Sequence, residues 1–322
     1  MKKIPLLVVG GPTASGKSRL AVELALLRNG EVVSADSMQI YQGMQIGTAK
    51  PTQEEMRGVP HHLVDFAPPD HAFSVAEYVM LAKQKVEEIH NRGHLPVVAG
   101  GTGLYIRSLI CNTQFAENES DPELRRQLTE RAQQEGVESL RQELFTFDPE
   151  SAARIDPRNI PRMVRAIELY RVSGMTMTEH LKKSHTEPSP YRVCFLCLNF
   201  RDRAKLYQRI DDRVDEMLRQ GLLEEARRVL EQPDGATALQ AIGYKELLPY
   251  FQGVMTKEQA AENVKQQTRR YAKRQITWFK REENVRWLYV DDYPDFDSLR
   301  TAANQMVGRE LYEQSGAETL GI

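Results

Sequence analysis

The sequence predicts an α/β protein with a parallel-sheet core and an inserted all-helical domain. Short apolar runs alternate with helical patterns over residues 1–114, and runs of the same kind return after residue 189. Residues 115–188 carry helical patterns and no convincing strand. Alternating strands and helices are typical of parallel sheets with crossover helices. We therefore expect a core of residues 1–114 and 189–322, with a helical domain at residues 115–188.

The first strands are short, apolar and bounded by turn-forming residues, as buried parallel strands usually are. They are expected at Ile4–Val9, Glu31–Ala35 and Leu95–Ala99, and His62–Phe66 is a weaker candidate. Between them lie segments whose apolar residues recur at intervals of three and four, which indicates helices with one buried face. These segments are Lys17–Arg28 and Val75–Asn91.

The insertion begins with a helix signal, in which Asp121 is a suitable cap and Pro122 takes the first helical position. Further helices are expected at Glu138–Leu144 and Ile160–Val172. The turn-forming segment Glu187-Pro-Ser-Pro190 ends the insertion.

After the insertion the chain returns to the sheet with strands at Arg192–Leu198 and Val285–Val290. Between them a long helix is expected from Thr256 to Arg281. Its last part, Lys265–Arg281, holds seven basic residues and no acidic one. The apolar side of this segment would pack inward, and the unbalanced charge on the other side favours contact with a phosphate backbone.

Composition excludes several classes of protein. Charged residues make up 27% and hydrophobic residues 41%, ordinary values for a globular protein. The net charge of −2 means that a nucleic-acid surface must come from local clustering. The sequence shows no apolar stretch long enough to span a bilayer, and the short apolar run near the N-terminus leads directly into a glycine loop. We expect a cytoplasmic protein without membrane association or an obligate protein partner.

Two pairs of residues suggest a metal or redox site, but a structural role explains them better. Cys194 and Cys197 lie on one expected strand, where residues three apart point to opposite faces. His61 and His62 are adjacent, so on a strand they also point apart.

The strongest chemical signal is GPTASGKS, which matches GxxxxGK[ST] between an expected strand and an expected helix. Glycines let backbone amides surround phosphate oxygens, and the helix N-terminus adds its positive dipole end. A lysine supplies positive charge, and the following hydroxyl can hold Mg²⁺. The sequence thus predicts a P-loop NTPase-like core that binds a polyphosphate, with Ser18 as the Mg²⁺ ligand, through Gly11, Pro12, Thr13, Ala14, Ser15, Gly16, Lys17 and Ser18.

Two further segments follow strands at the same edge of the sheet, where open α/β sheets bind ligands. Asp36 follows the second strand, and Ala99-Gly-Gly-Thr-Gly-Leu-Tyr105 follows another. On position alone, Asp36 fits a Mg²⁺ ligand, a general base or a helix cap. The glycines would let a substrate approach the backbone closely.

Together these segments resemble the tRNA dimethylallyltransferase family, also called tRNA isopentenyltransferases or IPP transferases. GPTASGKS, DSMQIYQGMQIGTAKP and GGTGLY occur in the family's order, and the resemblance runs from about residue 6 to residue 280. Other segments match the family more specifically than the P-loop does. They are His61–Leu63, Ile155–Asn159, Arg162–Glu168, Gln240–Glu246 and Lys273–Trp278.

The resemblance implies transfer of a dimethylallyl group from dimethylallyl diphosphate to N6 of adenosine 37, the tRNA nucleotide just 3′ of the anticodon. Asp36 then matches the general base, while Thr13 and Thr102 match positions near the reacting groups. The P-loop amides, Lys17 and Mg²⁺ would stabilise the leaving diphosphate. Two further candidates for contacting the diphosphate, which the sequence does not separate, are Arg209 and Arg213.

A buried pocket cannot reach a stacked base, so we expect the adenosine to be flipped out of the anticodon stem-loop. Residues 115–188 hold 11 Lys and Arg against 14 Asp and Glu, so contact with tRNA there would be local. Arg158, Arg162 and Arg165 share a helix face if one helix includes all three. By the resemblance, and by charge for the last two, the expected tRNA-binding residues are Asp36, Ser37, Met38, Gln39, Thr102, Arg125, Pro161, Arg162, Met163, Val164, Arg165, Gln240, Ala241, Ile242, Gly243, Tyr244, Lys245, Arg269 and Lys273.

Three other functions fit parts of the sequence. A P-loop kinase of a small metabolite leaves the basic run at 265–281 without a role. An isopentenyltransferase acting on free adenine nucleotides shares the first three segments but has less use for the insertion. A non-catalytic RNA-binding protein would bind tRNA without the chemistry of Asp36. Incubation with dimethylallyl diphosphate and unmodified tRNA separates these functions.

Overall fold

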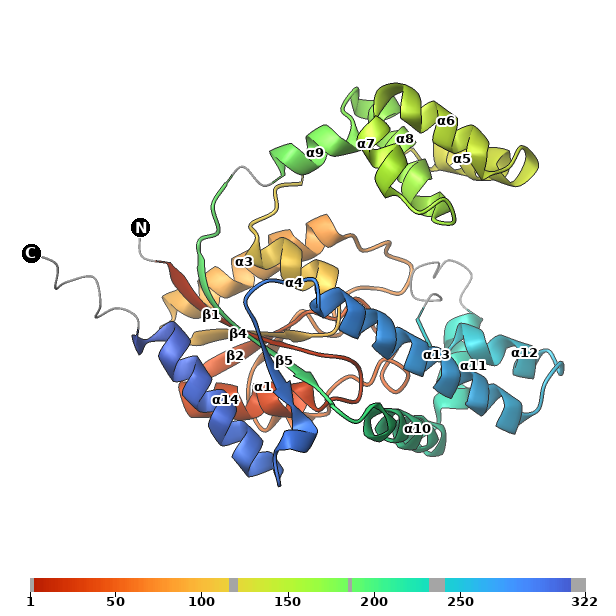
Figure 1. Ribbon diagram of the computed structural model, residues 1–322. Helices are drawn as coiled ribbons and strands as arrows, with labels where there is room; N and C mark the ends of the chain where they lie inside the picture. The colour runs from red at the N-terminus through yellow and green to blue at the C-terminus, as the bar shows by residue number, and fades with distance from the viewer. Residues whose placement is uncertain (1–2, 116–120, 185–186, 232–240, 314–322) are drawn as a thin grey trace, which may run out of the picture. The chain divides into compact units, whose positions relative to one another are not determined.

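The computed structural model describes residues 3–115, 121–184, 187–231 and 241–313. The chain divides into two compact units (Figure 1). Unit 1 consists of Met1–Ile110 and Pro190–Ile322, and unit 2 of Cys111–Ser189. These limits lie close to the expected domain limits of 115 and 188.

Unit 1 is built on a six-stranded sheet with the order β3-β2-β4-β1-β5-β6. Every neighbouring pair of strands is parallel, so the predicted α/β class with a parallel sheet is confirmed. Strand β1 lies between β4 and β5, and therefore joins strands from both sides of the insertion. The strands are β1 (Ile4–Gly10), β2 (Gly30–Ser34), β3 (His61–His62), β4 (Leu95–Gly100), β5 (Tyr191–Asn199) and β6 (Val285–Tyr289).

Strand β3 is shorter than expected, and the predicted strand His62–Phe66 is wrong. Leu63 and Asp65 have φ angles of 59° and 55°, which break an extended conformation. The chain turns away from the sheet directly after His62.

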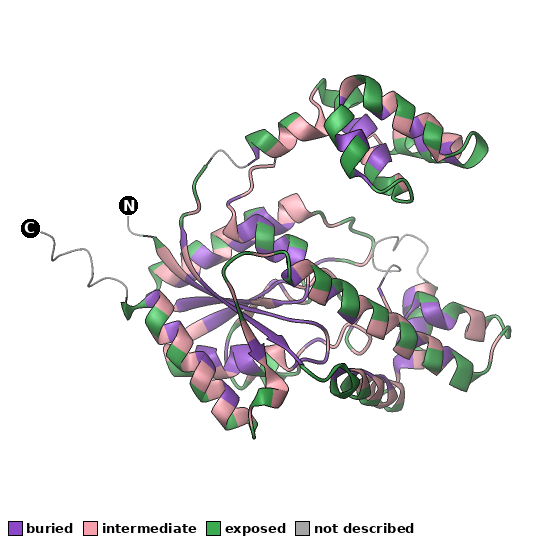
Figure 2. Ribbon diagram, viewed as in Figure 1, coloured by how far each residue is buried: buried purple, intermediate pink, exposed green. Residues whose placement is uncertain are grey.

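Helices cover both faces of the sheet, as a parallel sheet requires (Figure 2). Helix α1 (Lys17–Arg28) packs with α14 (Phe296–Leu311) on one core that includes Leu7, Leu196 and Leu299. Helix α3 (Val75–Asn91) packs against α4 (Gly103–Ile110), β2 and β4. The inner strands β1, β2, β4 and β5 are mostly buried, while the outer faces of the helices are exposed.

The remaining helices of unit 1 lie beyond the carboxyl ends of the strands (Figure 1). Helix α13 begins with a capping box in which the Thr256 hydroxyl accepts from Gln259 N–H. The segment after β2 packs Ile40, Tyr41 and Met44 against α11 and α13. These helices are α10 (Arg203–Arg219), α11 (Leu222–Leu230), η2 (Lys245–Leu247), α12 (Leu248–Phe251) and α13 (Lys257–Phe279). The short α2 (Gln53–Met56) is an exception and contacts α1, and η3 (Val290–Asp292) follows β6.

Unit 2 is helical in the residues that the structure describes, and it has its own core of Leu140, Leu144, Met163, Ile167 and other apolar side chains. Asp121 caps the first helix, as predicted. The helices are α5 (Pro122–Gln134), α6 (Val137–Phe147), α7 (Pro149–Arg154), α8 (Ile160–Ser173) and α9 (Met177–Lys183). The short α7 and α9 were not predicted. Within the described residues, no helix of either unit is long and apolar enough to cross a membrane.

Candidate active site

The P-loop links β1 to α1 in a tight curve of backbone. Gly11, Ala14 and Gly16 have φ angles of 146°, 61° and 91°, and the two glycines adopt these angles without steric cost. A Cβ atom at Gly11 would lie 2.8 Å from the carbonyl oxygen of Leu198, so glycine is required there. The buried hydroxyl of Ser15 finds no hydrogen-bond partner among the described residues.

Lys17 brings positive charge to this loop, and its Nζ donates to the carbonyl oxygen of Pro12 at 3.5 Å. Burial lowers its pKa to about 8, and the positive charge of Arg213 acts in the same direction. The Asp36 carboxylate partly offsets both effects. A bound anion would therefore favour the charged form of Lys17.

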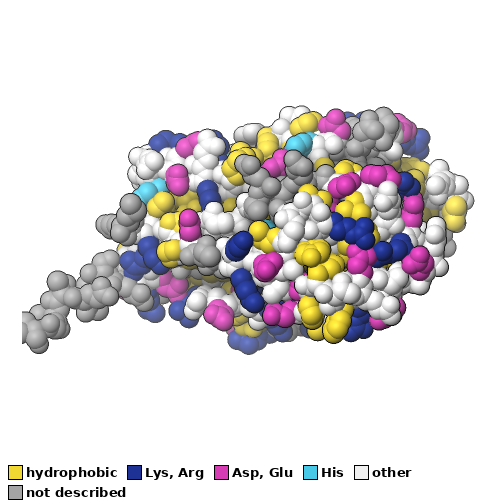
Figure 3. All heavy atoms as spheres, turned by 90° about the horizontal axis from the view of Figure 1, so that it is seen from above, with side chains coloured by type: hydrophobic (Ala, Val, Ile, Leu, Met, Phe, Trp, Pro, Cys, Tyr) yellow, Lys and Arg dark blue, Asp and Glu magenta, His cyan; other side chains and the backbone are white. Residues whose placement is uncertain are grey.

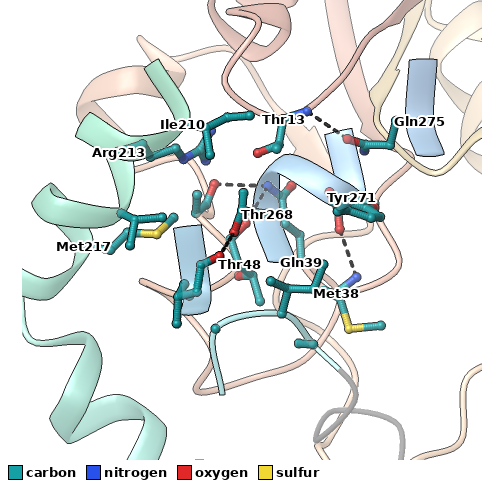
Figure 4. Close-up of a pocket in the computed structure, with 18 of the residues that line it drawn as sticks. Thr13, Met38, Gln39, Thr48, Ile210, Arg213, Met217, Thr268, Tyr271 and Gln275 are labelled. Atoms are coloured by element: carbon teal, nitrogen blue, oxygen red, sulfur yellow. Dashed lines mark hydrogen bonds between the residues drawn. The ribbon is translucent and has the colours of Figure 1, made fainter. Parts of the chain in front are cut away.

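A cavity of about 250 Å³ lies between the P-loop, the segment after β2 and helices α10 and α13 (Figure 4). One part of its wall is polar and charged, with Thr13, Lys17, Ser18, Asp36 and Arg213. Another part is apolar, with side chains from α10, α11 and α13. These side chains are Ile210, Val214, Met217, Leu222 and Val264. The cavity thus suits a molecule with an anionic group and a short apolar group.

Asp36 lies in a turn rather than at a helix start. Its Oδ1 accepts from the backbone N–H of Met38 at 3.0 Å, and residues 37–40 continue as a turn. The helix-cap interpretation is therefore wrong. Among the described residues no donor contacts Oδ2, so this oxygen remains available as a base or a metal ligand.

Thr102 supports the same turn from behind the cavity lining. Ser37 N–H donates to Thr102 Oγ1 at 3.0 Å, and Thr102 N–H donates to the carbonyl oxygen of Ala35 at 3.1 Å. Ser37, Met38 and Gln39 line the cavity, but Thr102 does not. Thr102 thus positions Ser37 from outside the cavity.

Gln275, a residue of α13 that is only 5% exposed, was not among the predicted site residues. Its Oε1 accepts from Thr13 N–H at 2.9 Å, and its Nε2 donates to the carbonyl oxygen of Gly101 at 3.0 Å. Figure 4 shows the bond to Thr13. One amide therefore connects the P-loop to the glycine loop after β4. Gln275 lies inside the segment Lys273–Trp278 that resembled the family, which was the available signal.

Arg209 and Arg213, which the sequence could not separate, lie in different places. Arg209 Nε donates to the carbonyl oxygen of Ala14 at 2.9 Å, and this residue lines an outer cavity of about 880 Å³ next to the P-loop. Arg213 lines both cavities, and burial lowers the pKa of its guanidinium group. Arg213 is therefore the better placed for an anion next to Lys17.

Comparison with known proteins identifies the family to which the chain belongs. The family model described as IPP transferase matches residues 39–282. The chain belongs to the IPP transferase family. The family that the sequence motifs predicted is thus confirmed.

The relatives of this IPP transferase match it over nearly their whole length. The tRNA dimethylallyltransferase of Thermoanaerobacter sp. strain X514 is 46% identical over 300 residues, which cover 92% of this chain and 95% of the relative. The tRNA dimethylallyltransferase of Bacillus subtilis strain 168 is 47% identical over 287 residues, which cover 89% and 91%.

Two solved structures are also similar to this chain over most of its length. The tRNA isopentenylpyrophosphate transferase of Bacillus halodurans is 41% identical with a TM-score of 0.73, and the match covers 97% of this chain and 98% of the other. A eukaryotic dimethylallyltransferase acting on tRNA is 29% identical with a TM-score of 0.77, and the match covers 92% of this chain and 77% of the other.

In this IPP transferase, the segment predicted to bind tRNA around residues 240–245 divides into two groups. Ala241, Ile242, Gly243 and Lys245 line the cavity. Tyr244 is instead fully buried, and its hydroxyl donates to Glu225 at 2.8 Å. Gln240 lies outside the described residues.

Arg158, Arg162 and Arg165, which would share a face if one helix included all three, do not lie on one helix. Helix α8 is capped by Asn159, whose side chain accepts from Arg162 N–H, so Arg158 precedes the helix. Arg158 is 92% exposed in its side chain and pairs with Asp156 at 2.9 Å. Arg162 is exposed on α8, after the exposed Pro161, and Arg165 is half-buried.

Two other residues of α8 that were expected to contact tRNA have buried side chains. Met163 and Val164 are buried in the core of unit 2, so their side chains do not reach the surface. Arg125 and Arg165 both pair with the fully buried Glu168, at 2.8 Å and 2.6 Å. This carboxylate therefore holds two guanidinium groups next to each other.

The charge on α13 is more balanced than the sequence suggests. Lys265 pairs with Asp215 of α10 at 2.6 Å, and Arg269 contacts both Asp211 and Glu262 at 2.6 Å. The predicted unbalanced charge over Lys265–Arg281 is therefore wrong at these two positions. Arg270 and Lys273 are exposed, and no carboxylate of the described residues pairs with them.

The face drawn in Figure 3 shows no large region of one sign. Basic side chains, in dark blue, lie interspersed with acidic ones, in magenta. This agrees with the net charge of −2.

Proposed function

We propose that this chain transfers the dimethylallyl group of dimethylallyl diphosphate to N6 of adenosine 37 in tRNA and releases diphosphate. The observation that carries this proposal is the cavity with a P-loop and two cationic side chains at one part of its wall and apolar side chains at another. The names of relatives that match nine-tenths of the chain support the same reaction.

The charged part of the cavity suits the diphosphate of the donor. With the donor bound, the P-loop amides, Lys17 and Arg213 would stabilise the negative charge that develops as the C–O bond to the diphosphate breaks. The apolar side chains of α10 and α13 then suit the five-carbon group.

The residues present also fit Mg²⁺. Ser18 offers an oxygen ligand in the cavity, and Mg²⁺ usually needs only one or two protein oxygens beside phosphates. Among the described residues there is no cluster of three or more His, Cys, Asp and Glu that would suggest another metal. Bound Mg²⁺ would neutralise part of the charge of the diphosphate.

Asp36 suits the role of general base. The lone pair of an exocyclic adenine amine is delocalised into the ring, so this nitrogen attacks better when a carboxylate takes its proton. The backbone N–H of Met38 fixes Oδ1 of Asp36, which leaves Oδ2 for the proton. Ser37, Met38 and Gln39 would then face the flipped adenosine.

The rest of the tRNA would be held by exposed basic side chains that touch phosphates. We assign this role to Arg162 and the Glu168-bound pair Arg125 and Arg165 in unit 2, and to Arg270 and Lys273 on α13.

The test is incubation of the protein with dimethylallyl diphosphate, Mg²⁺ and an unmodified tRNA transcript, followed by nucleoside analysis. We expect N6-dimethylallyladenosine at position 37 and no product when adenosine 37 is replaced by guanosine. Equal transfer to free adenine nucleotides would favour the nucleotide-modifying alternative. ATP turnover without tRNA and without prenyl transfer would favour a kinase and contradict the proposal.

A further inference from the structure

A second carboxylate, outside the cavity lining, is placed to control the shape of this cavity. Glu225 of α11 is 2% exposed and accepts hydrogen bonds from three consecutive backbone N–H groups. The bonds from Gln45 and Gly47 measure 2.8 Å, and Ile46 donates to both carboxylate oxygens at 2.9 Å. The Tyr244 hydroxyl donates to the same carboxylate at 2.8 Å.

Among the described residues, hydrogen bonds and the N-terminal turn of α11 compensate the charge of Glu225. No Lys, Arg or His of the described part of the chain forms an ion pair with it. A buried carboxylate without such bonds is very unfavourable, so the segment 45–47 and the carboxylate fix each other's position. The ring of Tyr244 closes the arrangement, because a Cβ atom at Gly47 would lie 2.6 Å from it.

The segment held by Glu225 continues directly into the wall of the cavity. Gly47, Thr48 and Ala49 line the cavity. The carbonyl oxygens of Thr48 and Ala49 accept from Gln39 Nε2 at 3.3 Å and 3.0 Å, and Gln39 lines the cavity as well. Figure 4 shows Thr48 and Gln39 next to each other. A shift at residues 45–47 would therefore move two parts of the wall together.

We propose that Glu225 is a positioning residue for prenyl transfer, which sets the wall formed by Gly47–Ala49 and Gln39 against the acceptor adenosine. This inference rests on the proposed function. Glu225 does not touch the reacting atoms; it acts through the backbone of residues 45–47 and through Gln39. Two acceptor oxygens are needed at this position, because residues 45–47 direct only backbone N–H donors towards Glu225.

The substitution Glu225→Gln tests this role. A glutamine keeps the size of the side chain, but it offers one acceptor oxygen and directs an NH₂ group towards N–H donors. The segment must then move away. Because a misplacement of about 1 Å can cost about 100-fold in rate, we expect single-turnover transfer with saturating donor and tRNA to fall by about 10- to 100-fold. The affinities for tRNA and for dimethylallyl diphosphate should change little.

The matched control is Glu31→Gln. Glu31 is 4% exposed and binds His62, Arg92 and His94, none of which lines the cavity. The same chemical change there should lower the melting temperature and leave the single-turnover rate of the folded protein unchanged. Tyr244→Phe removes only one of the donors to Glu225 and should have a smaller effect on the rate than Glu225→Gln.

The outcomes separate this inference from the proposed function. Absence of prenyl transfer in the wild-type protein contradicts the proposed function itself. Wild-type transfer together with a normal rate in folded Glu225→Gln overturns the positioning role alone, as does an equal loss of rate in Glu31→Gln. If Glu225→Gln does not fold, Gly47→Ala perturbs the same wall from the side of Tyr244, and a normal rate in that variant overturns the inference.

Discussion

At the scale of single residues, substitution of Asp36 distinguishes a general base from a Mg²⁺ ligand. The variant Asp36→Asn keeps an oxygen that accepts from Met38 N–H, so the turn should survive. Loss of a general base should lower single-turnover transfer by about 100- to 10,000-fold. Binding of tRNA and donor should change little, because the loss belongs to the transition state. A near-normal rate rules out the base, and recovery at high Mg²⁺ assigns Asp36 to the metal.

The pKa of Lys17 gives a second residue-scale prediction. The side chain is charged below its pKa of about 8 and neutral above it. A diphosphate binds the charged form better, so the dissociation constant of dimethylallyl diphosphate should rise as the pH increases through 8. Lys17→Met should bind the donor weakly at every pH, without this dependence. Calorimetric titration between pH 7 and pH 9 measures both, and an equal pH dependence in the variant would assign the titration to another group.

At the scale of secondary structure, α13 carries both paired and unpaired basic residues. Lys273→Ala should flatten the slope of log affinity for tRNA against log salt by about one unit, because one phosphate contact is lost. Arg269→Ala should leave the slope unchanged and lower the stability, since Asp211 and Glu262 lose their partner. Filter binding over a salt series and thermal unfolding test this. Equal slopes for wild type and Lys273→Ala would give α13 a folding role alone.

Periodicity and caps predicted many of these elements to within one or two residues. Helices α1 and α3 have their predicted bounds. The bounds of β1 and β4 differ from the predicted ones by one residue at one end, and those of β2 by one residue at each end. One error has a local cause, because positive φ angles at Leu63 and Asp65 end β3. Helix α8 begins at the predicted Ile160, and its cap at Asn159 excludes Arg158, a point that the sequence left open. Neither the φ angles nor the choice of cap follows from composition.

At the scale of the whole molecule, the sequence predicted the parts of the site that follow strands. The P-loop, Asp36 and the glycine loop come together because parallel strands end at one edge of a sheet. Gln275 reaches Thr13 over 262 residues of sequence, and Glu225 reaches Ile46 over 179. Such contacts depend on how α11 and α13 pack, so no local pattern gives them. Charge partners on α10 were hidden for the same reason, which led to the overestimated charge of α13.

The division into units predicts that the binding of tRNA and the binding of dimethylallyl diphosphate can be weakened separately. All residues that line the cavity belong to unit 1. The double variant Arg162→Ala and Arg165→Ala in unit 2 should therefore lower the affinity for tRNA and flatten its salt dependence, while the affinity for dimethylallyl diphosphate stays unchanged. Lys17→Ala should lower the affinity for dimethylallyl diphosphate and leave the affinity for tRNA unchanged.

The matched control in unit 2 is Arg126→Ala, because Arg126 is exposed and pairs with Glu123 and Glu130 of its own helix. Fluorescence titration with labelled tRNA and calorimetry with the donor measure the two affinities. If the double variant binds tRNA as Arg126→Ala does, these arginines take no part in binding, and α13 must supply the phosphate contacts of this tRNA-modifying enzyme.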